Sequence, residues 1–105
     1  MTLEEVRQDL EDIRCFYTMQ KTFVRGASIS RNQPIVHKVD MYNKAIAQAP
    51  AKLYVTYMEL YVENNTQERL GQLWGYTEGN IRYYSRKLCE FLMNYFNKQS
   101  KDSDN

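Results

Sequence analysis

A twenty-residue stretch at positions 67–86, QERLGQLWGYTEGNIRYYSR, constrains the fold more than any other part of the chain. Three glycines interrupt its helical composition, and two of them, Gly71 and Gly75, fall where the corner needs them. Gly75 suits a sharp turn, because glycine adopts a positive φ without the steric cost of a Cβ atom, and Gly71 allows a second helix to come close. Apolar residues flank the turn at the spacing of two packed helices: Leu70, Leu73, Trp74, Tyr76, Ile81, Tyr84 and Leu88. The stretch therefore predicts a helix-turn-helix whose second helix is N-capped by Thr77.

The first predicted helix runs from Thr2 to about Gly26. Thr2 and Glu5 have the spacing of a capping box, which would satisfy the first free amides of the helix. Its seam alternates steps of three and four residues and comprises Leu3, Val6, Leu10, Ile13, Tyr17, Gln20 and Val24, of which all but Gln20 have apolar or aromatic side chains. This is the a/d pattern of a helical seam, so the helix either pairs with a second copy as a coiled coil or packs in a hairpin with the next helix.

Two more helices are predicted before the glycine-containing unit. Small polar residues make 26–33 a loop, and Pro34 suits the first turn of a helix that ends near Pro50, because the residue before a proline is pushed out of helical conformation. A third helix, 51–63, carries a broad apolar stripe that should be largely buried, and Tyr54 belongs to it. Asn64 and Asn65 then break the helix, and Thr66 caps the next one.

These elements predict an all-α chain, since no segment shows strand-like alternation. Residues 1–50 form a helical or oligomerisation part, 51–98 form the helix-turn-helix part, and the polar residues 99–105 are an unstructured tail. At 105 residues the chain is too short for two full cores, so these parts form either one small domain or a DNA-binding head with a helical appendage. The last helix also carries more apolar surface than its own part needs, which indicates docking or a dimer contact. The residues concerned are Phe91, Leu92, Tyr95 and Phe96.

The charge is balanced overall but uneven along the chain. The formal net charge is only +1, which gives no general attraction for nucleic acid. Acidic residues dominate 1–12, where Arg7 is the single base, and basic residues dominate 81–101. An interaction with DNA would therefore depend on one face of the last helix.

That face carries side chains that recognise DNA. Arg pairs bidentately with guanine, Asn with adenine, and Glu accepts from cytosine, and each good pair discriminates by about 1–3 kcal/mol. The predicted base contacts are Glu78, Asn80, Arg82, Tyr83 and Arg86, and the predicted phosphate contacts are Gln67, Arg69, Thr77 and Lys87.

The segment YVENNTQERLGQLWGYTEGNIRYYSRKLCEFL resembles the helix-turn-helix of sigma-factor region four. With the preceding helices, the chain resembles small phage-encoded regulators of the ArpU and RinA type. The resemblance implies a sequence-specific, double-stranded DNA-binding transcriptional regulator that activates late genes of a phage or mobile element in a bacterial host. Two positions depart from the family pattern: Trp74 replaces a small aliphatic residue, and Gly71 replaces the more frequent alanine.

Several alternatives remain open. The acidic first helix and the balanced charge favour a protein-binding adaptor that docks on RNA polymerase or another host or phage protein. A DNA-packaging accessory protein would bind DNA and assemble into rings. The basic helix could also be only a solvated amphipathic face. For the regulator, a homodimer would address two half-sites about 34 Å apart.

Other site types are not predicted. His37 is the only histidine and should lie at the surface, and Cys15 and Cys89 lack ligand spacing around it, so we expect no metal, no cofactor and no enzymatic activity. No apolar run approaches the roughly 20 residues that cross a bilayer. The two distant cysteines and the absence of a secretion-type leader are typical of a cytoplasmic protein.

Overall fold

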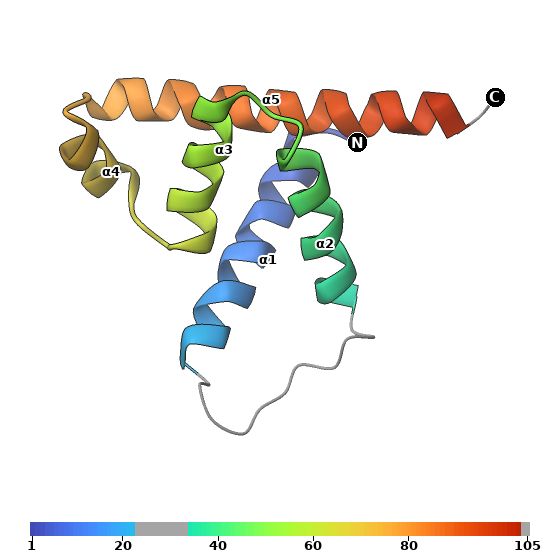
Figure 1. The fold of residues 1–105 in the computed structure, drawn as a ribbon, viewed down its shortest axis with the longest axis horizontal. Coiled ribbons are helices and arrows are strands. Elements are labelled where there is room, and N and C mark those ends of the chain that lie inside the picture. The colour runs from blue at the N-terminus through green and yellow to red at the C-terminus, as the bar shows by residue number, and fades with distance from the viewer. Residues whose placement is uncertain (23–33, 104–105) are drawn as a thin grey trace.

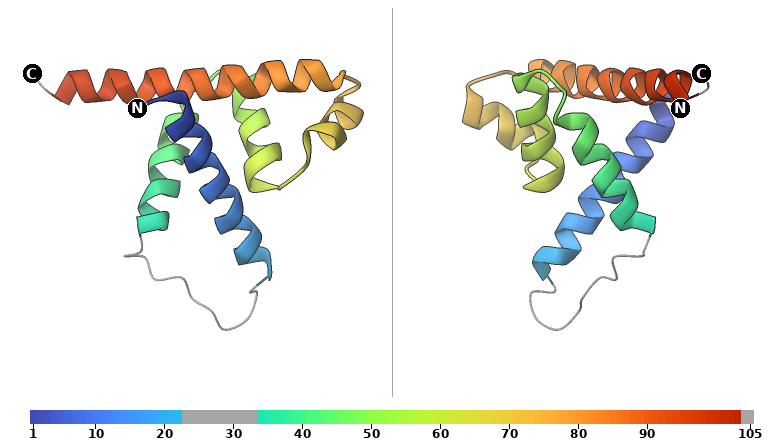
Figure 2. Two further views of the ribbon diagram at one scale, coloured as in Figure 1. Left: turned by 180° about the vertical axis from the view of Figure 1, so that it is seen from behind. Right: turned by 45° about the vertical axis from the view of Figure 1, so that its right-hand side comes forward.

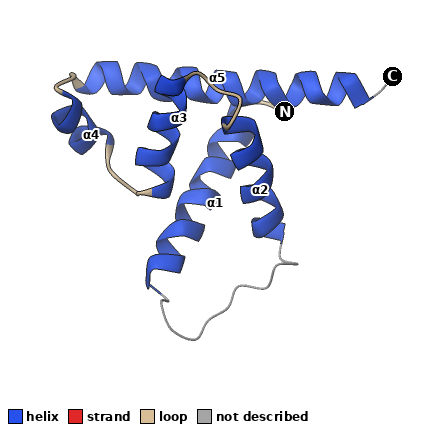
Figure 3. Ribbon diagram, in the orientation of Figure 1, coloured by secondary structure: helices blue, strands red, loops and turns tan. Residues whose placement is uncertain are grey.

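The computed structural model describes residues 1–22 and 34–103, and the described part of the chain is helical without any strand (Figures 1 and 3). The elements are α1 (Leu3–Thr22), α2 (Pro34–Ile46), α3 (Ala51–Tyr57), the π-helical η1 (Met58–Val62), α4 (Gln67–Trp74) and α5 (Glu78–Ser103). The predicted all-α class is confirmed. The predicted loop 26–33 and the residues Val24 and Gly26 lie outside the described residues.

The long helix α5 organises the molecule. It forms a bar along one side, with α4 under its N-terminal end, α3 next to α4, and α1 and α2 descending from its middle (Figure 1). The turned views show the same arrangement, with α1 and α2 side by side (Figure 2). Contacts join α5 to α1, α2, α3 and α4, and join α1 to η1. The N-terminal part of α5, which carries the predicted DNA contacts, is thus held by α3 and α4.

One hydrophobic core spans the chain. Val6, Leu10 and Ile13 of α1 are fully buried, and they belong to the same cluster as Leu60 and Leu92. The middle of the α1 seam is therefore used inside the molecule, whereas Leu3 and Tyr17 are half-buried and Gln20 is exposed. This cluster contains residues from both sides of position 50, in keeping with a chain too short for two full cores.

The C-terminal half of α5 packs on α2 and does not end where expected. Tyr42 meets Phe96 edge to face, with ring centroids 4.8 Å apart, so the apolar surface near Phe96 is used for docking within the chain. The predicted unstructured tail is wrong for residues 99–103, because α5 continues to Ser103. No proline or glycine interrupts these residues, and extending a formed helix costs far less than starting one.

The predicted helix 51–63 is present, but its last turn is π-helical and its buried face differs from the prediction. Tyr54 is 43% exposed, whereas Thr56 is fully buried and donates its hydroxyl to the Lys52 carbonyl oxygen at 2.8 Å. Side chains two positions apart on an α-helix point about 200° away from each other. When Thr56 faces the core, Tyr54 therefore faces solvent. The predicted break is confirmed: Asn64 has a positive φ of 61°.

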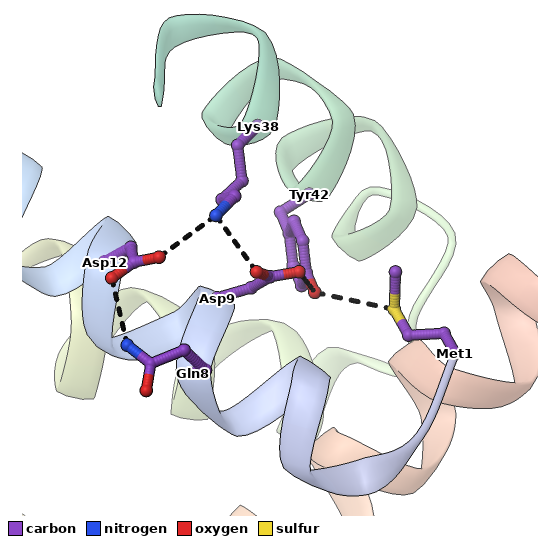
Figure 4. Close-up of polar contacts among 6 residues, drawn as sticks. All are labelled: Met1, Gln8, Asp9, Asp12, Lys38 and Tyr42. Atoms are coloured by element: carbon purple, nitrogen blue, oxygen red, sulfur yellow. Dashed lines mark hydrogen bonds and ion pairs between the residues drawn. The ribbon is translucent and has the colours of Figure 1, made fainter. Parts of the chain in front are cut away.

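A polar cluster fixes α1 against α2 (Figure 4). Lys38 Nζ lies 3.0 Å from Asp9 Oδ1 and 3.0 Å from Asp12 Oδ2, and the Tyr42 hydroxyl donates to Asp9 Oδ2 at 2.6 Å. The hydrogen bond from Lys38 lowers the pKa of Asp12, and the two carboxylates raise the pKa of Lys38. Part of the acidic front of the chain therefore has a structural role.

Candidate nucleic-acid interface

The corner between α4 and α5 is built by local backbone chemistry. The Thr66 hydroxyl accepts from the Arg69 amide at 3.1 Å and caps α4, and the Thr77 hydroxyl accepts from the Asn80 amide at 3.2 Å at the start of α5. Gly75 ends α4 in the left-handed region, with φ 69° and ψ 25°. The predicted caps and the predicted turn glycine are confirmed.

Gly71 is the point of closest approach in this corner. A Cβ atom built on Gly71 would lie 2.9 Å from the Tyr76 carbonyl oxygen and 3.5 Å from Cγ1 of Ile81. The Tyr76 amide also donates to the Gly71 carbonyl at 2.8 Å. The predicted role of Gly71 is confirmed, since any larger residue meets backbone that cannot move without opening the turn.

The packing inside the corner follows the prediction at most positions. Leu70, Ile81 and Leu88 are fully buried, and Trp74 is half-buried. Leu73 was expected in this core and is 59% exposed, so that prediction is wrong. Leu73 stands two residues after Gly71, which faces α5, and therefore points about 200° away from it.

A lysine from α3 closes the corner from its other side. Lys52 Nζ lies 4.3 Å from the ring centroid of Trp74, 4.4 Å from that of Tyr76 and 5.3 Å from that of Tyr84. It also donates to the Tyr76 hydroxyl at 3.1 Å. A cation over aromatic rings is attracted to their negative faces, so Lys52 links α3 to α4 and α5. Trp74 thus supplies one ring of this contact.

The outer face of the N-terminal part of α5 is exposed and mostly basic. Arg82, Tyr83, Arg86 and Lys87 are exposed, as is Asn80. Lys87 Nζ lies 5.5 Å from the centroid of the Tyr83 ring, and its ion pair with Glu90 is long, at 3.6 Å. Glu78 is the first residue of α5, but its side chain lies outside the described residues.

Some of the predicted DNA-contact residues line one common pocket, and others lie outside it. Gln67, Arg82 and Arg86 line one pocket of about 330 Å³ between α1 and α5, and Arg7 lines it from the opposite side. The exposed residues Arg69, Asn80 and Lys87 do not line this pocket, and neither does Thr77. Sequence reasoning missed Arg7, which stands alone among the acids of the first helix. The position of Arg7 in the sequence does not indicate a site, because Arg7 comes close to α5 only through the packing of α1.

The floor of this pocket is neutral and its wall is positive. Tyr61 and Cys89, both buried, lie at the floor beside Ser85, and burial raises the pKa of each of the two. Among the described residues none of the three pocket arginines forms an ion pair. Glu11, the acidic residue of the lining, pairs with Arg14 at 3.4 Å. The lining therefore holds three exposed guanidinium groups against one carboxylate, and its net charge is positive.

Other features of the described residues bear on function less directly. His37 is exposed, as expected. Within residues 1–22 and 34–103, no three or more His, Cys, Asp or Glu side chains gather as metal ligands would. No helix in these ranges has the length and apolar character needed to cross a membrane.

Comparisons of the chain with protein-family models, with curated proteins and with solved structures found no match. The resemblance of residues 61–92 to sigma-factor region four, and of the chain to regulators of the ArpU and RinA type, therefore stays a prediction.

Proposed function

We propose that the chain binds duplex DNA through the exposed face of α5 and acts as a transcriptional regulator. One observation carries the proposal: a basic, exposed helical face follows directly on a capped helix and a tight glycine corner. In a DNA-binding helix-turn-helix, the first residues of the second helix meet the base edges in the major groove. Arg82 and Arg86 occupy this place in α5.

The exposed side chains divide by chemistry and position. Arg82 and Arg86 lie one helical turn apart and can pair bidentately with guanine, and Asn80 can pair with adenine. Arg69 on α4 and Lys87 on α5 are exposed cations suited to phosphates on either side of the groove. Thr77 contributes through its cap, because its hydroxyl oxygen already accepts from the Asn80 amide.

The remaining parts of the expected role follow from the resemblance and belong to this proposal. They are activation of phage or mobile-element late genes and action in the host cytoplasm. A homodimer would need a surface other than the middle of the α1 seam, because Val6, Leu10 and Ile13 are buried within the chain.

Selection of bound sequences from a random DNA pool, followed by anisotropy titration, tests the proposal. The double substitution Arg82→Ala/Arg86→Ala should weaken specific binding by at least about thirtyfold, because two bidentate pairs are lost. The matched control Lys44→Ala/Lys98→Ala removes the same charge from exposed positions away from the corner and should bind normally. Affinity should also fall steeply with salt. Equal affinities of the two double variants would refute the proposal.

A second candidate function, a protein-binding adaptor, is favoured by the exposure of Leu73. This leucine is 59% exposed on α4, next to the corner, where a partner such as RNA polymerase could cover it. Leu73→Ser should then weaken polymerase binding in a pull-down with purified components and leave DNA affinity unchanged. Binding of polymerase that Leu73→Ser does not alter would count against this second role.

A further inference from the structure

Three arginines from two distant segments surround the pocket beside the proposed DNA-binding face. Arg82 and Arg86 stand four residues apart on α5, and Arg7 reaches the same pocket from α1. Like charges at this helical spacing repel, and a third one nearby adds to the cost. All three are exposed to solvent and none forms an ion pair in the described part of the chain, so a bound anion would relieve their mutual repulsion, which the single lining carboxylate, Glu11, does not cancel.

We propose that this pocket binds the phosphate group of a small phosphorylated molecule. Guanidinium groups bind phosphate through paired, charge-assisted hydrogen bonds, and three arginines line this one pocket. The amide of Gln67 and the hydroxyl of Ser85 add neutral donors to the same lining. The floor contributes no negative charge at neutral pH, since burial raises the pKa of both Cys89 and Tyr61.

The size and the rim of the pocket indicate what else the ligand carries. A volume of about 330 Å³ exceeds the need of a lone phosphate and falls in the range of roughly 300–1,000 Å³ that holds small organic ligands. Glu11, whose side chain is 58% exposed, stands at the rim as a hydrogen-bond acceptor. A hydroxyl-bearing phosphate such as a sugar phosphate fits this combination of donors and acceptor.

The position of the pocket also suggests regulation, and this step rests on the proposed DNA-binding function. Arg82 and Arg86 cannot hold a ligand phosphate in the pocket and pair with bases at the same time. The ligand should therefore compete with DNA. Arg7 belongs to the pocket and not to the proposed DNA contacts, whereas Arg69 belongs to the DNA contacts and not to the pocket.

Calorimetric and NMR titrations of the full chain test the pocket, with inorganic phosphate, ribose 5-phosphate and unphosphorylated ribose as probes at constant ionic strength. Ribose 5-phosphate should bind saturably, inorganic phosphate more weakly, and ribose not at all. Arg7→Gln should weaken ribose 5-phosphate binding by about tenfold or more, and Arg69→Gln should leave it unchanged. Arg7 contacts the buried Cys89 thiol, so Arg7→Gln also removes a contact that supports the fold. Arg82→Gln, at an exposed position of the same pocket, is therefore a second variant, and it should lose as much ribose 5-phosphate binding.

The two arginine variants keep this proposal separate from DNA binding. Arg7→Gln should lose the sugar phosphate and keep DNA, and Arg69→Gln should weaken DNA binding and keep the sugar phosphate. No saturable binding by wild type, or equal loss in Arg7→Gln and Arg69→Gln, would overturn the pocket whatever DNA binding shows. Sugar-phosphate binding without any DNA binding would uphold the pocket and overturn only the competition.

Discussion

The carbonyl oxygen of Tyr76 lies where the side chain of Gly71 would begin: a Cβ atom there would be 2.9 Å from it. The same two residues are joined by a hydrogen bond from the Tyr76 amide to the Gly71 carbonyl at 2.8 Å. The turn therefore folds back directly onto the middle of α4. An alanine at position 71 would therefore meet the backbone of the turn.

Gly71→Ala should destabilise the protein although alanine favours helices. The gain in helix propensity is at most about 1 kcal/mol, and the overpacking against backbone should cost about 1–3 kcal/mol. Urea unfolding measures the net effect. Gly79→Ala is the matched control, because its Cβ atom would meet only the Thr77 hydroxyl oxygen, at 3.9 Å. If Gly71→Ala were as stable as Gly79→Ala, the turn would have to move away from a Cβ atom at position 71 at little cost, which would contradict the close packing of this corner.

The stability cost of replacing Gly75 should depend on how readily the new residue adopts a positive φ, and not on the volume of its side chain. Nothing lies within 4 Å of a Cβ atom at this position, but its φ is +69°. Gly75→Ala should cost about 1–2 kcal/mol, and Gly75→Asn should cost less, because asparagine visits the left-handed region more readily. Thermal melts of the two variants give the comparison, and equal losses would contradict this account.

The contribution of Lys38 to stability should depend on pH in a defined window. The folded-state pKa of Asp12 is lowered from 3.8, so its contribution is present above that value and is lost as pH falls through the lower, folded-state pKa. The pKa of Lys38 is raised from 10.5, so its contribution is present below that value and is lost as pH rises through the higher, folded-state pKa. Lys38→Met should therefore cost about 1 kcal/mol near neutrality and less at either extreme. A cost that is the same at acid, neutral and alkaline pH would argue against the ion pairs.

Local features of the fold were predictable because their causes are local. The caps at Thr66 and Thr77 depend on one hydroxyl and an amide three residues away, and the roles of Gly71 and Gly75 depend on a missing Cβ atom. Such causes are visible in a short stretch of sequence. The all-α class followed from apolar spacing in the same way.

The features that the sequence did not predict depend on which elements meet. Arg7 joins Arg82 in a pocket only because α1 packs across α5, and apolar spacing does not specify that crossing. Leu73 and Tyr54 have apolar side chains that no neighbouring helix covers completely. Continuation of α5 to Ser103 reflects cooperative extension of a helix held elsewhere, which composition alone does not express.

Lys52 should matter for stability and for the environment of the corner, although it lies outside the predicted site. Its ammonium group contacts the rings of Trp74 and Tyr76 within 4.4 Å and donates to the Tyr76 hydroxyl. Lys52→Met keeps much of the length and removes the charge, so it should cost about 1 kcal/mol, the value of a partly exposed cation–π contact. Because Trp74 is the only tryptophan, its fluorescence should shift as well. Lys98→Met removes a charge from an exposed site on α5 and should change neither quantity. Unchanged stability and fluorescence in Lys52→Met would mean that α3 is held to the corner by its apolar contacts alone.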